Sequence, residues 1–336
     1  MSRAQTGAAR ENARTISVIV ATLNRAALLD ECLTHMARQR FEPGDEVIVV
    51  DNGSTDETAL VIERHRRAFS APLLGLTESR PGKSHALARA FTASTGDILA
   101  FTDDDVNVSD TWIDAIRRAM ADPTVALVGG AIEPRWEAKT PRWLQLNPDR
   151  YSRLAAPLAL VDYGPHVCDL GVRTAMGGNL AVRRSAMLRV GGFDPHLGKL
   201  RGTLLSGEDH DFCRRVQSAG LRACYCPEAR VRHWVPAERM RLRYFASWFF
   251  WSGITNAKLD DRDNARPRSL FGLPLYLVRR FTAGLIRAPL ALCAGDTTKA
   301  VDLAMDVAFA AGYAANRWGF VNLDRTERAV PMGDAA

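Results

Sequence analysis

Residues 97–106, DILAFTDDDV, are the most informative stretch of this 336-residue chain. Apolar residues run as far as Phe101, and Asp103, Asp104 and Asp105 follow almost at once. Three neighbouring carboxylates at the end of a buried strand repel one another and are costly to desolvate unless a cation or polar ligand satisfies them. The run therefore predicts a ligand site, although an acidic loop or the cap of the following helix is the plainer alternative.

A divalent metal ion that holds a phosphate would satisfy this run. Hard cations such as Mg²⁺ prefer oxygen ligands, and proteins usually hold them with one or two carboxylates plus substrate phosphates. Asp103 and Asp105 together could meet that need.

Two strand-like runs precede the acidic stretch, at residues 16–21 and 46–50, and a pattern of helical period follows each. Alternation of strand and helix predicts a parallel sheet. In such sheets ligands bind beyond the carboxyl ends of the strands. We therefore expect the loops that begin at Thr22 and Asp51 to face the same crevice as the acidic run.

Residues 79–84, SRPGKS, open a predicted helix that contains Leu87 and Phe91. A glycine, a lysine and a helix N-terminus suit an anion. The segment is not a Walker A loop, because the spaced second glycine is missing, and no GxGxxG motif follows the first strand. These absences weaken a nicotinamide-dinucleotide interpretation.

A second acidic pair, Glu208 and Asp209, opens a predicted helix with Phe212 and Val216 on its apolar face. Simple capping and compensation of the helix dipole are the alternative interpretation. Earlier, residues 177–184 (GGNLAVRR) are typical of a loop that enters a strand.

Composition places the chain among ordinary globular proteins, with 47% hydrophobic and 24% charged residues. The length allows one large α/β domain or two smaller ones. Six cysteines without an extracellular framework favour a reducing compartment. The segment up to Arg14 lacks the apolar core of a signal peptide and is predicted to be a disordered tail. The longest membrane-like stretch, residues 244–257, is shorter than the roughly 20 residues of a spanning helix.

The net charge of +6 is unevenly spread, because arginines concentrate from Arg230 onward among aromatic residues such as those at 248–251. This pattern fits nucleic acid, an anionic membrane surface, or solvated arginines beside a helical core.

The ordered set of motifs resembles family 2 glycosyltransferases with the GT-A fold. The segments that carry the resemblance are VIVATLNR (18–25), VVDNGSTDET (49–58), RPGKSHALARA (80–90), FTDDDV (101–106), GGNLAVRR (177–184), GGFD (191–194) and GEDHDFCRRVQSAG (207–220).

The resemblance implies an α/β fold, a Rossmann-like mixed sheet flanked by helices, over residues 15–235. It implies a nucleotide-binding half, 15–128, and an acceptor-binding half, 129–235. A helical extension is expected at 236–325. The remaining parts, 1–14 and 326–336, are expected to be tails.

Position by position, the resemblance places Thr22 and Asp51 at the base and ribose of a bound nucleotide. Arg80 and Lys83 fall in the segment beside that nucleotide. All four are therefore expected to bind the donor.

Asp103 and Asp105 match the outer members of the family's DxD element, with Asp104 in the variable middle position of this donor-binding run. The resemblance implies that Asp103 faces ribose and diphosphate and that Asp105 ligates Mg²⁺ or Mn²⁺. His233 resembles a histidine that helps to hold metal or diphosphate in part of the family, although a satisfied polar residue at a strand end is the plainer interpretation.

Glu208 and Asp209 match the family's ED element, in which Asp209 would be the catalytic base. Glu208, Gly178 and Asn179 are expected on the acceptor side.

The implied function is an inverting, metal-dependent transfer of a sugar from a nucleoside diphosphate sugar to a saccharide or lipid-linked acceptor, in polysaccharide or glycolipid biosynthesis. A carboxylate can accept the proton of an acceptor hydroxyl, and a divalent ion can neutralise the departing diphosphate. The QxxRW motif of processive members is missing, so one sugar per encounter is expected.

Two other functions stay open: a sugar-nucleotide nucleotidyltransferase and a non-catalytic sugar-nucleotide binding module. A UDP-sugar is the expected donor, but the sequence fixes neither nucleobase nor acceptor. We expect a cytoplasmic protein without a nucleic-acid partner. Its C-terminal region could contact the inner face of the plasma membrane, pack on the catalytic domain or form a homodimer.

Overall fold

The chain forms two compact units in a computed structural model that describes residues 14–146, 152–194, 197–198, 203–263 and 268–321. The first unit comprises Met1–Ala138, Leu158–Arg201 and Gly207–Pro236. The second comprises Lys139–Pro157, Gly202–Ser206 and Ala237–Ala336. Apart from Arg14, the tails expected at 1–14 and at 326–336 lie outside the described residues.

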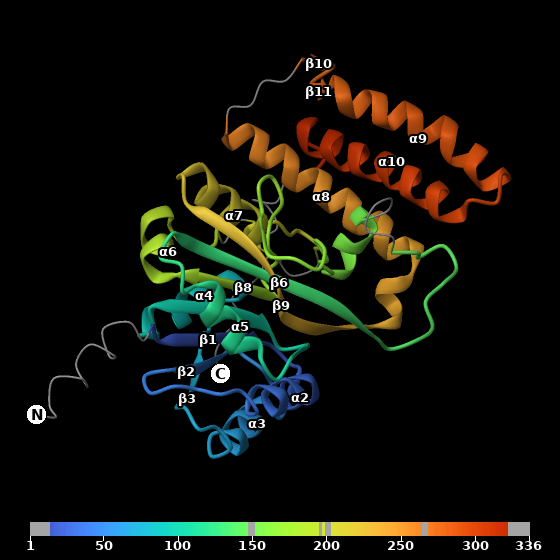
Figure 1. Cartoon of the computed structure of the whole chain (residues 1–336). Coiled ribbons are helices and arrows are strands. Elements are labelled where there is room, and N and C mark those ends of the chain that lie inside the picture. Colours follow the sequence, from blue (N-terminus) through green and yellow to red (C-terminus); the bar gives the residue numbers. More distant parts are fainter. Residues whose placement is uncertain (1–13, 147–151, 195–196, 199–202, 264–267, 322–336) are drawn as a thin grey trace, which may run out of the picture. The chain divides into compact units, whose positions relative to one another are not determined.

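A mixed sheet forms the centre of the first unit (Figure 1). Its strands are β1 (Ile16–Thr22), β2 (Glu46–Asp51), β3 (Leu73–Thr77), β4 (Ile98–Asp103), β5 (Val106–Val108), β6 (Val125–Trp136), β7 (Cys168–Asp169), β8 (Asn179–Arg183) and β9 (Arg222–Val235). The strand order is β3-β2-β1-β4-β8-β6-β9-β5, and β7 also pairs with β9. The predicted parallel core is confirmed, because β1 pairs in parallel with both β2 and β4.

The strand register gathers the predicted site residues at one edge of the sheet. Asp51 lies opposite Thr22, and Asp103 lies opposite Ala21 at the end of the same strand. On the other side of β4, the antiparallel strand β8 begins with Asn179 opposite Thr102. The carboxyl ends of three parallel strands and the start of β8 therefore meet, as ligand sites in α/β sheets require.

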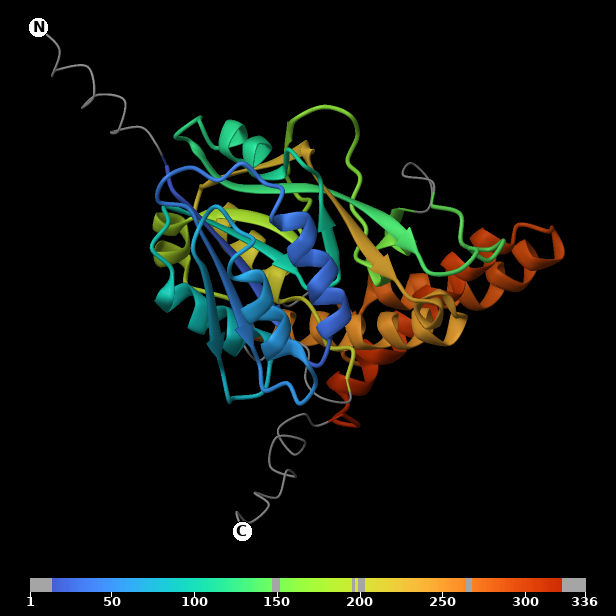
Figure 2. The same ribbon diagram turned by 90° about the horizontal axis from the view of Figure 1, so that it is seen from below.

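Six helices accompany the sheet in the described part of the first unit. They are α2 (Ala26–Met36), α3 (Thr58–His65), α4 (Lys83–Ala93), α5 (Trp112–Ala119), α6 (Arg184–Val190) and α7 (Glu208–Ser218). Their apolar faces confirm the predicted periodicity: α2, for example, buries Leu29, Leu33 and Met36. Figure 2 shows α2 and α3 side by side.

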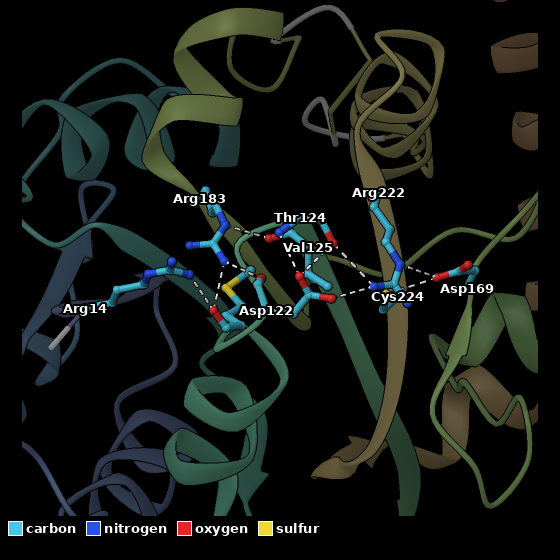
Figure 3. A network of polar contacts seen from close by, with 9 residues as sticks. Arg14, Asp122, Thr124, Val125, Asp169, Arg183, Arg222 and Cys224 are labelled. Atoms are coloured by element: carbon cyan, nitrogen blue, oxygen red, sulfur yellow. Dashed lines mark hydrogen bonds and ion pairs between the residues drawn. The ribbon is translucent and has the colours of Figure 1, made fainter. Parts of the chain in front are cut away.

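A polar network (Figure 3) lies at the other end of the strands, away from the predicted site residues. The guanidinium of Arg183, at the end of β8, donates to the backbone carbonyl oxygens of Met120, Asp122 and Val125. The side chain of Arg222, at the start of β9, pairs with Asp122 at 2.7 Å. Because these ion-paired groups are largely solvated, each pair contributes little stability alone, and the network mainly fixes the turn between α5 and β6.

The second unit is helical in its C-terminal part, as predicted. It contains η1 (Ser152–Leu158) in part, η2 (Ala237–Met240), α8 (Leu242–Arg262), the short strands β10 (Ser269–Leu270) and β11 (Leu273–Pro274), α9 (Leu275–Cys293) and α10 (Thr297–Arg317). Figure 1 shows α10 between α8 and α9. The helices approach closely: a Cβ at Gly312 would lie 1.8 Å from the carbonyl oxygen of Phe250.

The aromatic residues of α8 pack within this unit. Phe249 is buried, and the ring of Trp143 meets Phe245 edge-on with centroids 4.9 Å apart. Trp248 and Trp251 are only partly exposed. None of the helices in the described ranges has an apolar stretch long enough to cross a membrane.

Candidate active site

Arg25 binds two carboxylates of the acidic run between β4 and β5. Its Nη1 atom donates to Asp104 and to Asp105, each at 2.9 Å. Both carboxylates are buried, so a single guanidinium offsets much of the repulsion between them. No pattern in the sequence pairs Arg25 with this run, because the charges meet only when β1 and β4 pair.

Asp104 points into the interior of the first unit. Its carboxylate accepts a hydrogen bond from the hydroxyl of Thr22 at 2.8 Å, in addition to the one from Arg25. Burial raises the pKa of Asp104 to about 6, an effect that Arg25 opposes and Asp105 reinforces. Thr22 and Asp104 are thus buried and bonded to each other beneath the exposed residues of the site. Their donor-binding roles stay predictions.

Lys83 supplies a second cation to the acidic run. Gly82, with φ of +121°, precedes it, and this backbone conformation lets the chain turn sharply into α4. The ammonium of Lys83 contacts the Asp103 carboxylate. Burial alone would lower the pKa of Lys83, but Asp103 and the carboxylates of Glu208 and Asp209 outweigh it and hold the pKa above its usual value.

Asn52 fixes the loop that carries Arg80 beside Asp51. Its Nδ2 donates to the backbone oxygens of Glu78 and Arg80, at 2.8 and 2.7 Å, and its Oδ1 accepts from the backbone of Gly82 at 2.8 Å. The guanidinium of Arg80 pairs with Glu78 and lowers the pKa of that carboxyl to about 2. Asn52 was not singled out from the sequence.

The Gly177-Gly178 loop brings the two acidic motifs to one place. The backbone N–H of Gly177 donates to Oδ2 of Asp209 at 3.0 Å. At the next residue, a Cβ on Gly178 would lie 3.3 Å from Oδ2 of Asp103. Glycines at these positions therefore allow Asp103, Lys83 and Asp209 to surround a shared space.

Phe193, from the GGFD motif, connects the elements that carry these carboxylates. Its ring lies 5.2 Å from that of Phe101 in β4 and 4.9 Å from that of Phe212 in α7, measured between centroids. Aromatic packing therefore sets α7 against β4.

Glu208 and Asp209 differ in their surroundings at the start of α7. Both Asp209 oxygens accept backbone hydrogen bonds, from Gly177 and from His210. Burial, followed by the negative charge of Asp209, raises the pKa of Glu208. Burial also lowers the pKa of His210, whose Nδ1 lies 3.2 Å from the Thr174 hydroxyl.

His233 reaches Asp105 because β5 pairs with β9. Val106 lies opposite His233 in this antiparallel ladder, and Nε2 of His233 is 3.5 Å from Oδ1 of Asp105. Within the described residues, no cluster of three or more His, Cys, Asp and Glu side chains could hold a metal ion. One carboxylate and one imidazole nevertheless fit a divalent ion whose other ligands come from substrate phosphates and water.

The side chain of Asn179 is buried and hydrogen-bonded within the first unit. Its Nδ2 donates to the backbone oxygens of Ala131 and Ala229, at 2.9 and 2.7 Å, and its Oδ1 accepts from the Trp112 indole at 2.9 Å. This side chain joins β8 to β6, β9 and α5, and its acceptor-side role stays a prediction.

Comparisons with known proteins agree with this fold. The profile of the family described as "Glycosyltransferase like family 2" matches residues 13–246. The chain is 27% identical over 249 residues to the glucosyl-dolichyl phosphate glucuronosyltransferase of Haloferax volcanii, covering 73% of this chain and 77% of that protein. It is 30% identical over 214 residues to the succinoglycan biosynthesis protein ExoM of Rhizobium meliloti, covering 63% and 64%.

A solved structure shares the architecture. The mannosyltransferase PcManGT from Pyrobaculum calidifontis, in complex with GDP-Man and Mn²⁺, superposes with a TM-score of 0.60 at 22% identity. The superposition covers 90% of this chain and 87% of that one. The fold is thus the GT-A fold of glycosyltransferases. The chain belongs to glycosyltransferase family 2, and it is a glycosyltransferase of glycan or glycolipid biosynthesis.

Proposed function

We propose that this enzyme is an inverting, divalent-metal-dependent glycosyltransferase. It moves a sugar from a nucleoside diphosphate sugar to a saccharide or lipid-linked acceptor. The observation that carries the proposal is the Gly177-Gly178 loop, which approaches both Asp103 of the donor side and Asp209 of the acceptor side.

The donor is proposed to lie along the carboxyl edge of β1, β2 and β4. Asp51 is partly exposed there. Its carboxylate accepts a hydrogen bond from the backbone N–H of Ser54 at 2.8 Å, which fixes the carboxylate at the end of β2. Arg80 and Lys83 add positive charge on the same side, where a diphosphate would need it.

Charge at the diphosphate is the main chemical requirement. A nucleoside diphosphate leaves with accumulated negative charge, and fixed cations that face this charge lower the barrier. Lys83 stays protonated near neutral pH because of its carboxylate neighbours. A bound Mg²⁺ or Mn²⁺, held by Asp105 and His233, would supply further Lewis-acid stabilisation.

Asp209 is the proposed general base. Its two backbone hydrogen bonds fix the carboxylate, and Lys83 lies close enough to influence it electrostatically. A positioned carboxylate can accept the proton of an acceptor hydroxyl as that oxygen attacks the anomeric carbon. A base on the face opposite the leaving group implies inversion.

The acceptor class draws support from the relatives, one of which is named for a dolichyl phosphate acceptor and another for succinoglycan biosynthesis. The mannosyltransferase structure contains GDP-Man, whereas the sequence favoured a UDP-sugar, so both nucleotides belong in a test.

The purified full chain should release nucleoside diphosphate from one member of a panel of UDP-, GDP- and dTDP-sugars when Mn²⁺ or Mg²⁺ is present, and not after chelation. Asp105→Ala should abolish this turnover and the metal-enhanced binding of the matching nucleoside diphosphate, measured by calorimetry. The exposed Asp110→Ala serves as the control.

Equal, metal-enhanced nucleotide affinity in Asp105→Ala and parent would remove Asp105 from the metal site. Donor binding without release or transfer would favour a binding module. An NMR spectrum of the product that shows a retained anomeric configuration would rule out inversion.

A further inference from the structure

Helix α9 carries an apolar and basic surface that the described residues leave uncovered. Four aliphatic side chains within eight residues are more than half exposed, namely Leu285 (53%), Ile286 (65%), Leu290 (63%) and Leu292 (60%). Aliphatic groups gathered in this way mark an interaction site more often than single exposed residues do.

The opposite side of α9 packs against α10. Leu277, Gly284 and Ala291, spaced seven residues apart, are the buried positions of α9. A Cβ at Gly284 would lie 2.7 Å from the carbonyl oxygen of Leu303 in α10. The helix therefore has one packed face and one outward face.

The charge of α9 is entirely positive. Its sequence, LYLVRRFTAGLIRAPLALC, contains three arginines and no acidic residue. Arg280 is paired with Asp306 of α10, its Nε atom 2.8 Å from the carboxylate. Arg279 and Arg287 are exposed, and no carboxylate among the described residues pairs with either.

We propose that the outward face of α9 binds an anionic lipid surface. Aliphatic side chains that enter the boundary between headgroups and acyl chains, together with arginines that contact anionic headgroups, define a helix that lies in the membrane interface. The sequence suggested membrane contact through the aromatic residues 248–251, of which Phe249 is buried and the other three are partly exposed, whereas the aliphatic residues named on α9 are more than half exposed. The surface is therefore assigned to α9.

Charge complementarity favours lipid over a second copy of the chain. In a symmetric dimer the same patch meets itself. Arg279 and Arg287 would then meet another copy of a face that carries no acidic residue of α9 to offset their charge. An anionic membrane offers the opposite charge to both.

Flotation of the full chain with vesicles tests the proposal. The parent should float at low ionic strength with vesicles of phosphatidylcholine mixed with phosphatidylglycerol, and neither with phosphatidylcholine alone nor at high salt. Arg279→Gln combined with Arg287→Gln should weaken partitioning roughly thirty-fold. Ile286→Ser combined with Leu290→Ser should abolish it.

Matched control variants change exposed residues of the first unit. Arg40→Gln with Arg67→Gln removes two charges, and Leu60→Ser with Leu188→Ser removes two exposed aliphatic side chains. Both control pairs should float like the parent. Circular dichroism and donor hydrolysis should match the parent for every variant, because none of the changed residues belongs to the proposed donor site.

A parent that does not float with the anionic vesicles overturns the proposal. So does flotation that both α9 variants retain, because lipid would then bind elsewhere. A dimer that light scattering detects in the parent, and that Ile286→Ser with Leu290→Ser converts to monomer without any vesicle binding, would assign the face to a second copy. These outcomes are independent of whether a donor is found.

Discussion

The acidic run is nearly balanced by side chains from other elements. Asp103 contacts Lys83 of α4, and Asp104 and Asp105 share Arg25. A donor diphosphate would add negative charge, so it must either recruit a further cation or draw Lys83 and Arg25 toward itself. This balance explains how three consecutive carboxylates are tolerated at the edge of a buried sheet.

Asp209→Asn should separate binding from chemistry. The amide keeps the shape of the side chain but cannot accept a proton, so donor affinity should persist while transfer falls by about 10² to 10⁴. Product formation and calorimetric donor affinity are measured on the same preparation, with Asp110→Asn as the control. Transfer within a few-fold of the parent would move the base to another residue.

Glu208→Gln should change stability in a pH-dependent way. The raised pKa of Glu208 means that folding disfavours its ionised form. Glu208 therefore supports the folded state fully below its unfolded pKa of about 4.3, and this support is lost as the pH rises through the raised value. The uncharged variant should exceed the parent in stability at about pH 8, and the excess should vanish below about pH 4.

Urea unfolding across this pH range measures the difference. Glu63→Gln, which alters an exposed residue paired with Arg66, should stay within about 0.5 kcal/mol of the parent throughout. An excess of the Glu208 variant that is equal at both ends of the range would contradict the assignment to Glu208 ionisation.

The contacts of the site residues were only partly predictable, and their roles stay predictions. The sequence pointed to Asp103, Asp105 and Asp209 because acidic residues at strand and helix ends are conspicuous. Arg25 and Asn52 were missed, since each acts through contacts to distant loops that form only in the folded sheet. No short-range pattern records such contacts.

Among the helices, the close packing of α10 against α8 depends on two glycines. Gly253 and Gly312 lie where α8 and α10 cross, and a Cβ at Gly253 would lie 2.1 Å from the carbonyl oxygen of Phe309. Close approach of this kind lets two helices contact through their backbones.

Gly312→Ala should push these helices apart. The added methyl group would meet the Phe250 carbonyl, and overpacking of this kind costs about 1–3 kcal/mol. Thermal unfolding should show a Tm several degrees lower. Ala311→Ser, one residue away and exposed, also adds one heavy atom and should leave the Tm within a degree or so. An unchanged Tm in Gly312→Ala would mean that the crossing is looser than described.

Long elements with a clear period were predictable, and short ones were not. The strands predicted at 16–21 and 46–50 match β1 and β2, and the helical pattern predicted after the first of them matches α2. Strand β5 has only three residues, and its pairing with β9 depends on a partner far along the chain. Yet this pairing brings His233 to Asp105.

For the whole molecule, the grouping of the chain departs from sequence order. Lys139–Pro157 and Gly202–Ser206 belong to the helical unit, although both lie within the range expected for the catalytic domain. In the helical unit, the hydroxyl of Thr255 in α8 donates to the backbone oxygen of Ser206 at 2.9 Å. The sequence could not reveal this grouping, because the order of segments along the chain says little about which helices a distant loop packs against. The division into nucleotide- and acceptor-binding halves stays a prediction.

The network of Arg183 and Arg222 (Figure 3) lies, by the strand registers, at the opposite end of the strands from Asp51 and Asp103. Groups that hold this end of the sheet together are thereby kept apart from the groups that we propose to meet the donor. Engineering of donor preference can exploit this separation. Libraries that vary residues 53–57 and 78–82 can sample new sugar nucleotides, while both arginines are held constant to keep the scaffold intact.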